Sequence, residues 1–283
     1  MSESLPALTP ALWVVSTPIG NLDDITRRAV QVLEQASVIA AEDTRHTQRL
    51  LDEFGIRRPL LSYHDHNEEA RAREIVARIQ AGEAVALVSD AGTPLLSDPG
   101  YRVVRACQQA GVRVIPVPGA SALLAALAVA GLPTDRFVFE GFLPAKGSTR
   151  QQMLTRLASA SATTVFYEAP HRIASTLAEL AEVLTPEREV VLCRELTKHF
   201  ETVLTGSAQL LLEKVRADAN QQRGEMVLLI GPASEDTAAL GEHLELAKLL
   251  LAELPASKAA KVLAAYSGKK RGEVYQWLET LER

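Results

Sequence analysis

The sequence predicts an α/β protein with two α/β domains followed by a small helical domain of helix-turn-helix-like spacing. Short apolar runs alternate with helical patterns over residues 12–117, which is typical of a parallel sheet covered by helices. A second α/β pattern follows, and the final segment contains helical patterns alone. We therefore expect domains at 12–117, 118–232 and 240–283, and we call residues 240–283 the tail.

Five short apolar runs are expected to form the strands of the first domain. They are Leu12–Val15, Val38–Ala41, Pro59–Ser62, Ala84–Val88 and Arg113–Pro116. Helical patterns lie between them, and those over 67–80 and 100–110 are each followed by a glycine, a common helix C-terminal signal. In this order the runs predict a parallel sheet.

The second domain and the tail have different patterns. Three strands are expected in the second domain, at Thr163–Tyr167, Glu189–Arg194 and Met226–Ile230. The small and polar residues 232–239 indicate a linker. In the tail, helices are expected at Leu244–Leu254, Lys258–Tyr266 and Glu273–Leu281, with Ser257 as the cap of the second.

Composition places the chain among globular proteins. It has 283 residues, of which 47% are hydrophobic, and a net charge of -5, which argues against a general affinity for nucleic acid. No signal-peptide pattern is present at residues 1–10, and the longest apolar stretch, residues 120–130, is too short to cross a membrane. Cys107 and Cys193 stand alone in apolar surroundings, which favours reduced core residues in a cytoplasmic protein.

Two loops that follow apolar strands are the strongest functional signals. Residues 89–100, SDAGTPLLSDPG, hold two glycines, two prolines and two aspartates directly after the run Ala84–Val88. Residues 16–26, STPIGNLDDIT, follow the first strand. Ligands of open α/β sheets bind at such strand ends, so both loops favour a small-molecule site. Neither loop has the glycine pattern of a dinucleotide fingerprint or of a Walker A loop.

Carboxylate and imidazole side chains follow two other strands. Glu42 and Asp43 come after Val38–Ala41; Asp43 has the position of a helix cap, so Glu42 is the better candidate for acid-base chemistry. His64 and His66 alternate after the third strand. No ligand cluster of recognisable spacing completes a metal site, so we expect no metal, and His64 is instead a candidate to assist removal of a hydroxyl proton.

The loop sequences resemble the tetrapyrrole-methylase superfamily, the class III S-adenosylmethionine (SAM) methyltransferases. This chain keeps Gly20 but has Ser16 and Pro18 where most members have glycine, which fits a branch that methylates small-subunit ribosomal RNA. Further segments of this branch occur in order along residues 12–231. They are AEDTR (41–45), SYHDHNE (62–68), SDAGTP (89–94), SDPG (97–100), PGAS (118–121), YEAPHR (167–172), RELTK (194–198) and GEMV (224–227).

The resemblance implies two α/β domains with SAM in the cleft between them, and a homodimer. The implied reaction is 2'-O-methylation of a cytidine ribose in small-subunit (16S) ribosomal RNA, as free RNA or within the 30S subunit, with no metal. By the family pattern, SAM contacts fall on Pro18, Ile19, Asp90, Thr93, Ser121, Ala122, Leu196 and Met226. Asp90 is the best candidate for a polar partner of SAM.

Basic residues form two further groups. The tail has five of them between Ser257 and Arg271 without an acidic one, which suits a phosphate backbone, although a packing or dimerisation bundle with a solvated face stays open. These five are Lys258, Lys261, Lys269, Lys270 and Arg271. The others, His171, Arg172, Arg194 and Lys198, follow strands of the second domain. They could hold RNA phosphates or form salt bridges between the domains.

Two other classes of function remain open at this point. A corrin or porphyrin precursor methyltransferase of the same superfamily would have no use for a basic tail. A non-catalytic regulator that senses SAM and binds nucleic acid would not need the acidic and histidine loops of the first domain. The sequence therefore favours the RNA methyltransferase.

Overall fold

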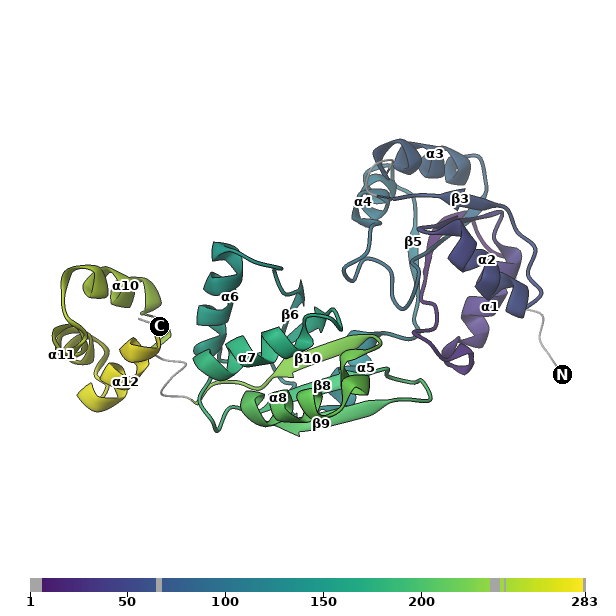
Figure 1. The fold of residues 1–283 in the computed structure, drawn as a ribbon. Coiled ribbons are helices and arrows are strands. Elements are labelled where there is room, and N and C mark those ends of the chain that lie inside the picture. Colours follow the sequence, from purple (N-terminus) through teal and green to yellow (C-terminus); the bar gives the residue numbers. More distant parts are fainter. Residues whose placement is uncertain (1–6, 65–67, 235–239, 242, 282–283) are drawn as a thin grey trace. The chain divides into compact units, whose positions relative to one another are not determined.

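The structure is a computed structural model that describes residues 7–64, 68–234, 240–241 and 243–281 (Figure 1). The chain divides into two compact units, residues 1–125 and 126–283. Helix α5, Ala122–Val129, spans the boundary between the two units. The second unit includes the tail, so the three predicted domains stay a prediction.

The first unit contains a fully parallel five-stranded sheet in the order β3-β2-β4-β1-β5. Its strands are β1 Ala11–Val15, β2 Val38–Ala41, β3 Leu60–Ser62, β4 Ala84–Val88 and β5 Val114–Val117. Strands β2 and β4 are buried along their whole length, because helices cover both faces of the sheet. The continuous apolar runs of the sequence therefore predicted this sheet within a residue or two.

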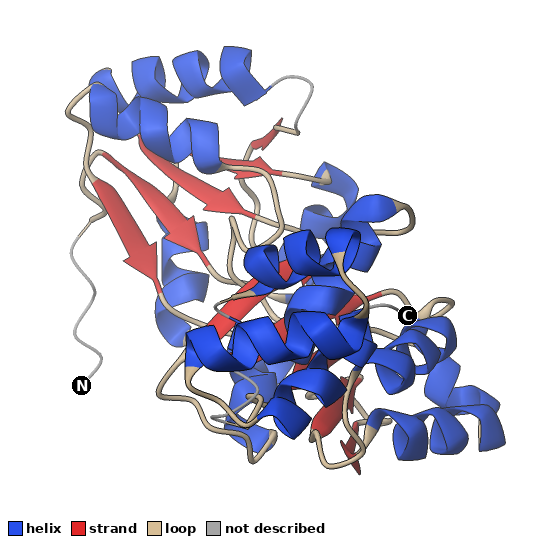
Figure 2. Ribbon diagram, turned by 90° about the vertical axis from the view of Figure 1, so that its left-hand side faces the viewer, coloured by secondary structure: helices blue, strands red, loops and turns tan. Residues whose placement is uncertain are grey.

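Helices cover both faces of the first sheet (Figure 2). They are α1 Arg27–Gln35, α2 Thr44–Glu53, α3 Glu68–Gln80 and α4 Tyr101–Gln109, with a short 3-10 turn, η1 Leu22–Asp24, before α1. Residues of α1 and α2 pack with Val15, Ile39 and Val88 on one face. Residues of α3 and α4 pack with Leu12, Val38 and Leu87 on the other. The sheet is therefore doubly wound.

The second unit contains a mixed sheet in the order β6-β7-β10-β8-β9. Its strands are β6 Phe137–Phe142, β7 Thr163–Glu168, β8 Val190–Arg194, β9 Thr202–Gly206 and β10 Met226–Ile230. Only β6 and β7 are parallel; the other pairs are antiparallel. Neither edge strand was predicted from the sequence, because neither β6 nor β9 has the buried apolar run that is typical of the central strands.

Three helices pack against one another and the second sheet through a core that includes Phe166, Leu177, Leu192 and Leu211. These helices are α6 Ser148–Ala158, α7 Ile173–Val183 and α8 Ala208–Ala217, followed by the 3-10 turn η2 Ala219–Gln222. Arg188 is buried nearby and donates hydrogen bonds to the carbonyl oxygens of Leu157 and Gly231, at 3.0 and 2.6 Å. It thereby satisfies a carbonyl in the last turn of α6.

The tail forms three helices around its own small core. They are α10 Leu244–Glu253, α11 Ala256–Ser267 and α12 Arg271–Leu281. Ala260, Leu263, Trp277 and Leu278 form part of the core. The predicted cap at Ser257 is wrong: α11 begins at Ala256, two residues earlier than predicted, after Pro255, whose fixed backbone angle suits a helix start. In the described part of the chain, no helix is long and apolar enough to cross a membrane.

Candidate functional site

The candidate site is built on the carboxyl edge of the first sheet. Strand β1 leads through α1 on one face to β2, whereas its neighbour β4 leads through α4 on the other face to β5. The loops after β1 and β4 therefore separate at their strand ends, which makes this position the topological switch point of the sheet. The two loops singled out in the sequence, 16–26 and 89–100, both start there.

Backbone hydrogen bonds tie the loops after β1 and β4 together. The Thr17 N–H donates to the Gly92 carbonyl oxygen at 2.9 Å, and the Gly92 N–H donates to that of Thr17 at 3.0 Å. Side chains extend this link: the hydroxyl oxygens of Ser16 and Thr93 lie 2.9 Å apart, and Thr93 donates to the Ala120 carbonyl oxygen at 3.1 Å. Segments after β1, β4 and β5 thus form one connected surface.

Two glycines permit this close packing. Gly92 has a left-handed backbone with φ of +75°, and a Cβ atom there would lie 3.2 Å from Cγ2 of Ile19. A Cβ atom on Gly119 would lie 2.9 Å from Cβ of Ser16, which is closer than real atoms approach. Any side chain at these two positions would push the loops apart or displace Ile19.

Two buried hydroxyl groups on this surface make no hydrogen bond within the described residues. Thr17 is 2% exposed and Ser121 is 6% exposed, yet neither Oγ1 of Thr17 nor Oγ of Ser121 has a partner there. Buried polar groups are normally satisfied, so such atoms suit contact with a bound polar molecule. The sequence analysis named Ser121 but missed Thr17, whose position between a strand and Pro18 was the available signal.

Asp90 links the loops after β2 and β4. Its Oδ1 accepts a hydrogen bond from the Asp43 N–H at 3.0 Å, so the half-buried Asp90 lies beside Glu42 and Asp43. Asp43 caps α2 as predicted, and its hydrogen bonds and ion pair with Arg45 hold the pKa of its carboxyl well below the usual range. Burial raises the pKa of the nearby Asp98, with a further contribution from the charge of Asp90.

Glu42 and His64 follow neighbouring strands. Ala41 pairs with Ser62, and the Tyr63 N–H donates to the Ala41 carbonyl oxygen at 2.9 Å, which brings the residues after β2 and β3 together. Glu42 is half-buried and His64 is exposed. His66, the other imidazole of the sequence analysis, lies outside the described residues. Among the described residues, no group of three or more His, Cys, Asp or Glu side chains could hold a metal.

Tyr63, which directly precedes His64, is fully buried at the carboxyl edge of the first sheet. Its hydroxyl donates to the Val88 carbonyl oxygen at 3.1 Å. Burial raises the pKa of Tyr63 far above its usual value, and the charges of Glu42, Asp98, Glu68 and Asp90 raise it further. The Tyr63 hydroxyl therefore stays protonated at neutral pH and is a structural donor.

Glu68 fixes the far end of the loop after β4. It is buried at the start of α3, and its Oε1 accepts hydrogen bonds from the Gly100 and Arg102 N–H groups, at 2.9 and 3.0 Å. A carboxylate at the first turn of α4 satisfies donors that the helix leaves free. The capping of α4 by Glu68 was not predicted from the sequence, because no local pattern indicates a cap that another helix supplies.

Basic residues after the strands of the second unit have partners within that unit. Arg172 pairs with the buried Glu168 at 3.0 Å, and Arg194 donates to the Phe200 carbonyl oxygen at 2.7 Å and to Thr202 Oγ1 at 3.0 Å. Lys198 Nζ lies 2.9 Å from the carboxylates of both Glu195 and Glu225. Burial acts to raise the pKa of Glu195, but these bonds outweigh it and the pKa is lowered. His171 is exposed.

The two candidate cofactor residues of the second unit lie at one end of its sheet. Leu196 is buried in the loop after β8, between Glu195 and Thr197, which both have positive φ angles. Met226 begins β10 opposite Arg194, and the Glu195 N–H donates to the Glu225 carbonyl oxygen at 2.9 Å. These contacts bring the segments of Leu196 and Met226 together.

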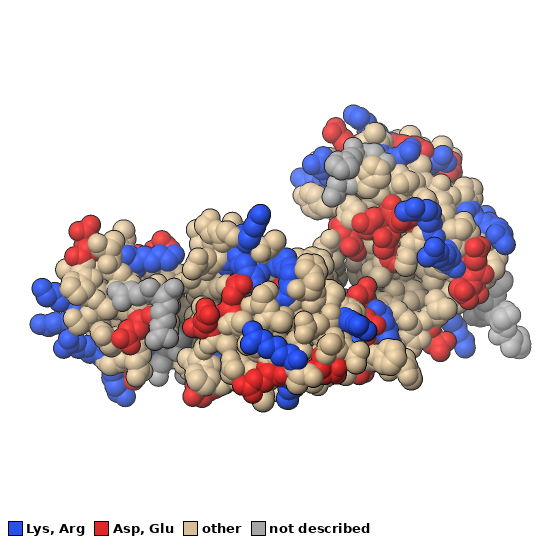
Figure 3. Space-filling view, viewed as in Figure 1, with Lys and Arg blue, Asp and Glu red and all other residues tan. Residues whose placement is uncertain are grey.

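The basic residues of the tail lie on α11, in the turn after it and at the first position of α12. Four of them are exposed and Lys269 is half-buried. Arg271 donates to the Ser257 carbonyl oxygen at 3.3 Å, and Lys270 lies 3.5 Å from Glu273. Figure 3 shows basic side chains gathered on the tail helices.

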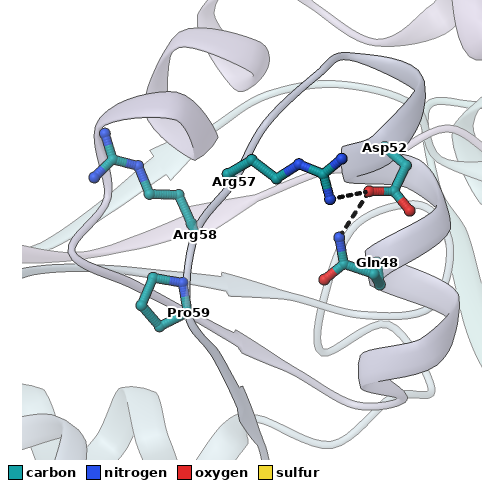
Figure 4. Close-up of a pocket in the computed structure, with 5 residues that line it drawn as sticks. All are labelled: Gln48, Asp52, Arg57, Arg58 and Pro59. Carbon is teal, nitrogen blue, oxygen red and sulfur yellow. Dashed lines mark hydrogen bonds and ion pairs between the residues drawn. The ribbon is translucent and has the colours of Figure 1, made fainter.

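A hollow lined by α2 and the segment before β3 is unrelated to these loops (Figure 4). Its polar side chains bind one another: Arg57 and Gln48 both donate to the Asp52 carboxylate, at 3.2 and 2.9 Å. Arg58 donates to the Glu34 carbonyl oxygen at 2.6 Å. None of the predicted site residues lines this hollow.

The comparisons with known proteins identify the family. The family model of the tetrapyrrole (corrin/porphyrin) methylases matches residues 11–211, more than half of the chain. The chain belongs to this family. This methylase is therefore a SAM-dependent methyltransferase, as the resemblance implied. A second family model, the C-terminal helix-turn-helix domain of RsmI proteins, matches residues 237–282. This match confirms the prediction that the tail is a helix-turn-helix domain.

Close relatives of this methylase match nearly its whole length. The ribosomal RNA small subunit methyltransferase I of Pseudomonas aeruginosa is 51% identical over 94% of this chain and 95% of its own. The protein of the same name from Escherichia coli O157:H7 is 48% identical over 94% and 93%. The chain belongs to this branch of the family.

Solved structures agree on the fold at low identity. A cobalt precorrin-4 methyltransferase is 20% identical with a TM-score of 0.57, over 78% of this chain and 95% of its own. A uroporphyrin-III C-methyltransferase from Thermus thermophilus, complexed with S-adenosylhomocysteine, is 20% identical with a TM-score of 0.51, over 78% and 97%. These likenesses confirm the two-sheet methylase fold.

Proposed function

We propose that this methylase transfers the methyl group of SAM to the ribose 2'-hydroxyl of a cytidine in small-subunit (16S) ribosomal RNA. The observation that carries the proposal is the match to ribosomal RNA small subunit methyltransferase I proteins over both the methylase body and the tail. A tetrapyrrole methyltransferase would share the body but has no need for a basic tail. The 2'-oxygen and the cytidine rest on the family resemblance.

SAM would be held by the loops at the carboxyl edge of the first sheet. Pro18 and Ile19 are buried in the loop after β1, and Thr93 and Ser121 belong to the connected surface described above. Ala122, Leu196 and Met226 complete the proposed set. The unsatisfied hydroxyls of Thr17 and Ser121 and the carboxylate of Asp90 fit a cofactor rich in donors and acceptors.

The chain must orient the acceptor hydroxyl and help it lose its proton. When bound, SAM supplies a strongly electrophilic methyl group, so alignment and exclusion of water are the main tasks of the protein. Glu42 and His64 are the proposed proton acceptors, because both follow strands at the edge that carries Asp90. Tyr63 is excluded as the base because its hydroxyl stays protonated at neutral pH.

A homodimer and a cytoplasmic location are also proposed. The dimer rests on the family resemblance, and the exposed Phe137, Val138 and Phe142 of edge strand β6 are consistent with it. The location rests on the proposed substrate and on two buried free thiols, Cys107 and Cys193. Light scattering should give twice the chain mass; a monomer at micromolar concentration would contradict the dimer.

A labelling experiment tests the reaction. The protein is incubated with radiolabelled SAM and with small ribosomal subunits, or free 16S RNA, from cells that lack this modification. Label is expected in one ribose-methylated cytidine, detected as an alkali-resistant dinucleotide. Label in a tetrapyrrole precursor, or binding of SAM without transfer, would favour one of the two alternative functions instead.

Removal of the tail tests its part in the reaction. A chain ending at residue 239 keeps every proposed SAM residue, so its SAM affinity should match that of the full chain, while methylation of ribosomal subunits should fall by tenfold or more. Charge reversal at Lys258, Lys261, Lys269, Lys270 and Arg271 should mimic the truncation. Full-rate methylation by the truncated chain would show that the tail is a packing or dimerisation element.

A further inference from the structure

The outward face of α11 combines basic, apolar and aromatic side chains. Residues 258, 261, 262, 265 and 266 lie on one side of the helix by its 3.6-residue period, and all five are exposed. The opposite side, with Ala259, Ala260 and Leu263, is buried in the core of the tail. Packing within the tail therefore leaves this face available. Its residues are Lys258, Lys261, Val262, Ala265 and Tyr266, and we call them the α11 stripe.

Tyr266 is the most unusual member of the stripe. Its side chain is 68% exposed, although burial of an aromatic ring is favourable. The ring of His243, at the start of α10, meets it edge-to-face with 5.3 Å between the ring centroids. This contact limits the orientations of the Tyr266 ring. Proteins stack unpaired bases on exposed aromatic rings that lie near basic side chains, and Tyr266 is an exposed ring of limited orientation on the same face as two lysines.

Helix α12 offers a less suitable surface for RNA. In a helix-turn-helix the second helix is the usual reader of a groove, and here that helix is α12. Its exposed or half-exposed residues include Glu273 and Glu279, and Glu273 lies 3.5 Å from the ammonium group of Lys270. By contrast, the sequence from Ser257 to Arg271 contains no acidic residue. The distribution of charge therefore favours α11 over α12 as the helix that contacts the RNA backbone.

We propose that the α11 stripe binds an unpaired segment of RNA, with one base stacked on Tyr266 and phosphates held by Lys258 and Lys261. This inference rests on the proposed function, in which the tail binds ribosomal RNA, and it names the helix, the residues and the form of RNA. A stacked base must be free of its neighbours, so a regular duplex cannot use Tyr266 in this way.

The test compares two tyrosines of the full-length chain. Binding of a fluorescein-labelled, unpaired pyrimidine 12-mer oligoribonucleotide and of a 12-base-pair RNA duplex is measured by anisotropy. Tyr266→Leu should weaken binding of the unpaired RNA about 5- to 150-fold, the range of one lost stacking contact, and leave duplex binding within twofold. The matched control is Tyr275→Leu on α12, where the side chain is 36% exposed; it should change neither affinity by more than twofold.

A salt titration separates the two parts of the stripe. Each phosphate contact contributes about 0.7 to the slope of log affinity against log salt for single strands. The double variant Lys258→Gln/Lys261→Gln should lower that slope by about 1.4, whereas Tyr266→Leu should weaken binding without changing the slope. Unchanged affinity in Tyr266→Leu, an equal loss in Tyr275→Leu, or an equal loss on duplex RNA would overturn the proposal.

The outcomes also separate this inference from the proposed function. If Tyr266 proves essential for binding unpaired RNA but labelled SAM never methylates ribosomal subunits, the stripe is correct and the reaction is wrong. If subunits are methylated and Tyr266→Leu binds the 12-mer as the unchanged chain does, the reaction is correct and the stripe is wrong. Heat unfolding of Tyr266→Leu should match that of the unchanged chain, because the ring is largely exposed.

Discussion

The two sheets of this methylase use the residues at their strand ends in different ways. In the first unit all strands are parallel, so the loops after β1, β2, β4 and β5 begin at one edge. Backbone bonds such as Thr17 to Gly92 tie the loops together, while the Thr17 and Ser121 hydroxyls stay unsatisfied within the described residues. In the second unit, the basic side chains of Arg172, Arg194 and Lys198 already bind partners within the unit, although the Thr197 hydroxyl beside Leu196 is also unsatisfied within the described residues.

This difference indicates which polar groups recognise a ligand and which maintain the fold. A charged side chain already held by a carboxylate or by carbonyl groups stabilises its own unit, and its removal should act on stability. A polar atom on a connected loop surface without a partner has no such structural task, and its removal should act on binding. The predictions below separate these two effects.

The largest expected effect is a loss of stability in the second unit. Arg150 is buried and donates to Glu179, Thr176 and the Pro144 carbonyl oxygen at 2.7 to 3.2 Å. Arg150→Met should lower the free energy of unfolding by about 1–3 kcal/mol, because the buried Thr176 hydroxyl and the Pro144 carbonyl oxygen lose a hydrogen-bond donor, while Glu179 is partly exposed to solvent. The matched control is Arg73→Met, whose pair with Glu69 is exposed, and it should cost less than about 1 kcal/mol.

Urea unfolding measures the free energy of unfolding of both arginine variants. Calorimetry measures their SAM affinity at about 10 °C, because the folded state of a typical domain is near its most stable there. The affinity should stay within twofold for both folded proteins, because neither arginine belongs to the proposed cofactor surface. An Arg150→Met protein of unchanged stability that lost SAM binding would contradict the division between the two units.

The second effect concerns Gly92, where the loop after β4 forms backbone hydrogen bonds with the loop after β1. Gly92→Ala would place a methyl group against Ile19 in a left-handed backbone, and SAM binding should weaken at least tenfold. Gly111 has a similar φ of +68°, but a Cβ atom there would have no neighbour within 4 Å, so Gly111→Ala should add the backbone strain of about 1–2 kcal/mol and leave SAM affinity unchanged. Equal SAM affinities in the two variants would show that the close approach of these loops is unimportant.

The last effect, which is absent at neutral pH, is a loss of stability in alkali that reports one thiol in each unit. Burial raises the pKa of Cys107 to about 11 and that of Cys193 to about 12, from an ordinary value of 9.0. Above pH 9 the unfolded thiols ionise while the folded ones stay protonated, so stability falls as pH rises, by at most about 1.4 kcal/mol per pH unit for each thiol.

Single substitutions assign the alkaline effect. In unfolding measurements between pH 8 and 11, Cys107→Ala and Cys193→Ala should each flatten the decline by the contribution of one thiol. A decline that is equally steep in the double variant would mean that other groups cause it.

The sequence predicted the first unit well because its strands are continuous apolar runs with loops of unusual composition. It predicted the Asp43 cap, which is a local interaction, and it placed Asp90 and Thr93 on the same loop. It missed the cap that Glu68 gives to α4, because 32 residues separate Glu68 from Gly100. Edge strands β6 and β9 were missed because much of each is exposed and their patterns are weak.

The roles of the charged residues in the second unit could not be predicted from sequence for a related reason. Arg172 and Arg194 read equally well as phosphate ligands or as ion-pair partners, since the pattern gives the residue type but not the partner. Tertiary structure supplies Glu168 for one and the Phe200 carbonyl oxygen for the other. The buried, unsatisfied hydroxyl of Thr17 is likewise visible only once the loops are folded.

The most direct test of the account compares two aspartates that each accept a backbone hydrogen bond. Asp90 in the first unit accepts from the Asp43 N–H at 3.0 Å, and Asp218 in the second unit accepts from the Asn220 N–H at 2.9 Å. SAM titration calorimetry is measured for Asp90→Ala and Asp218→Ala, both shown to be folded. SAM affinity should fall about 10- to 150-fold in Asp90→Ala, the range of one hydrogen bond to a charged group, and less than twofold in Asp218→Ala. Unchanged SAM affinity in Asp90→Ala, or an equal loss in both variants, would contradict it.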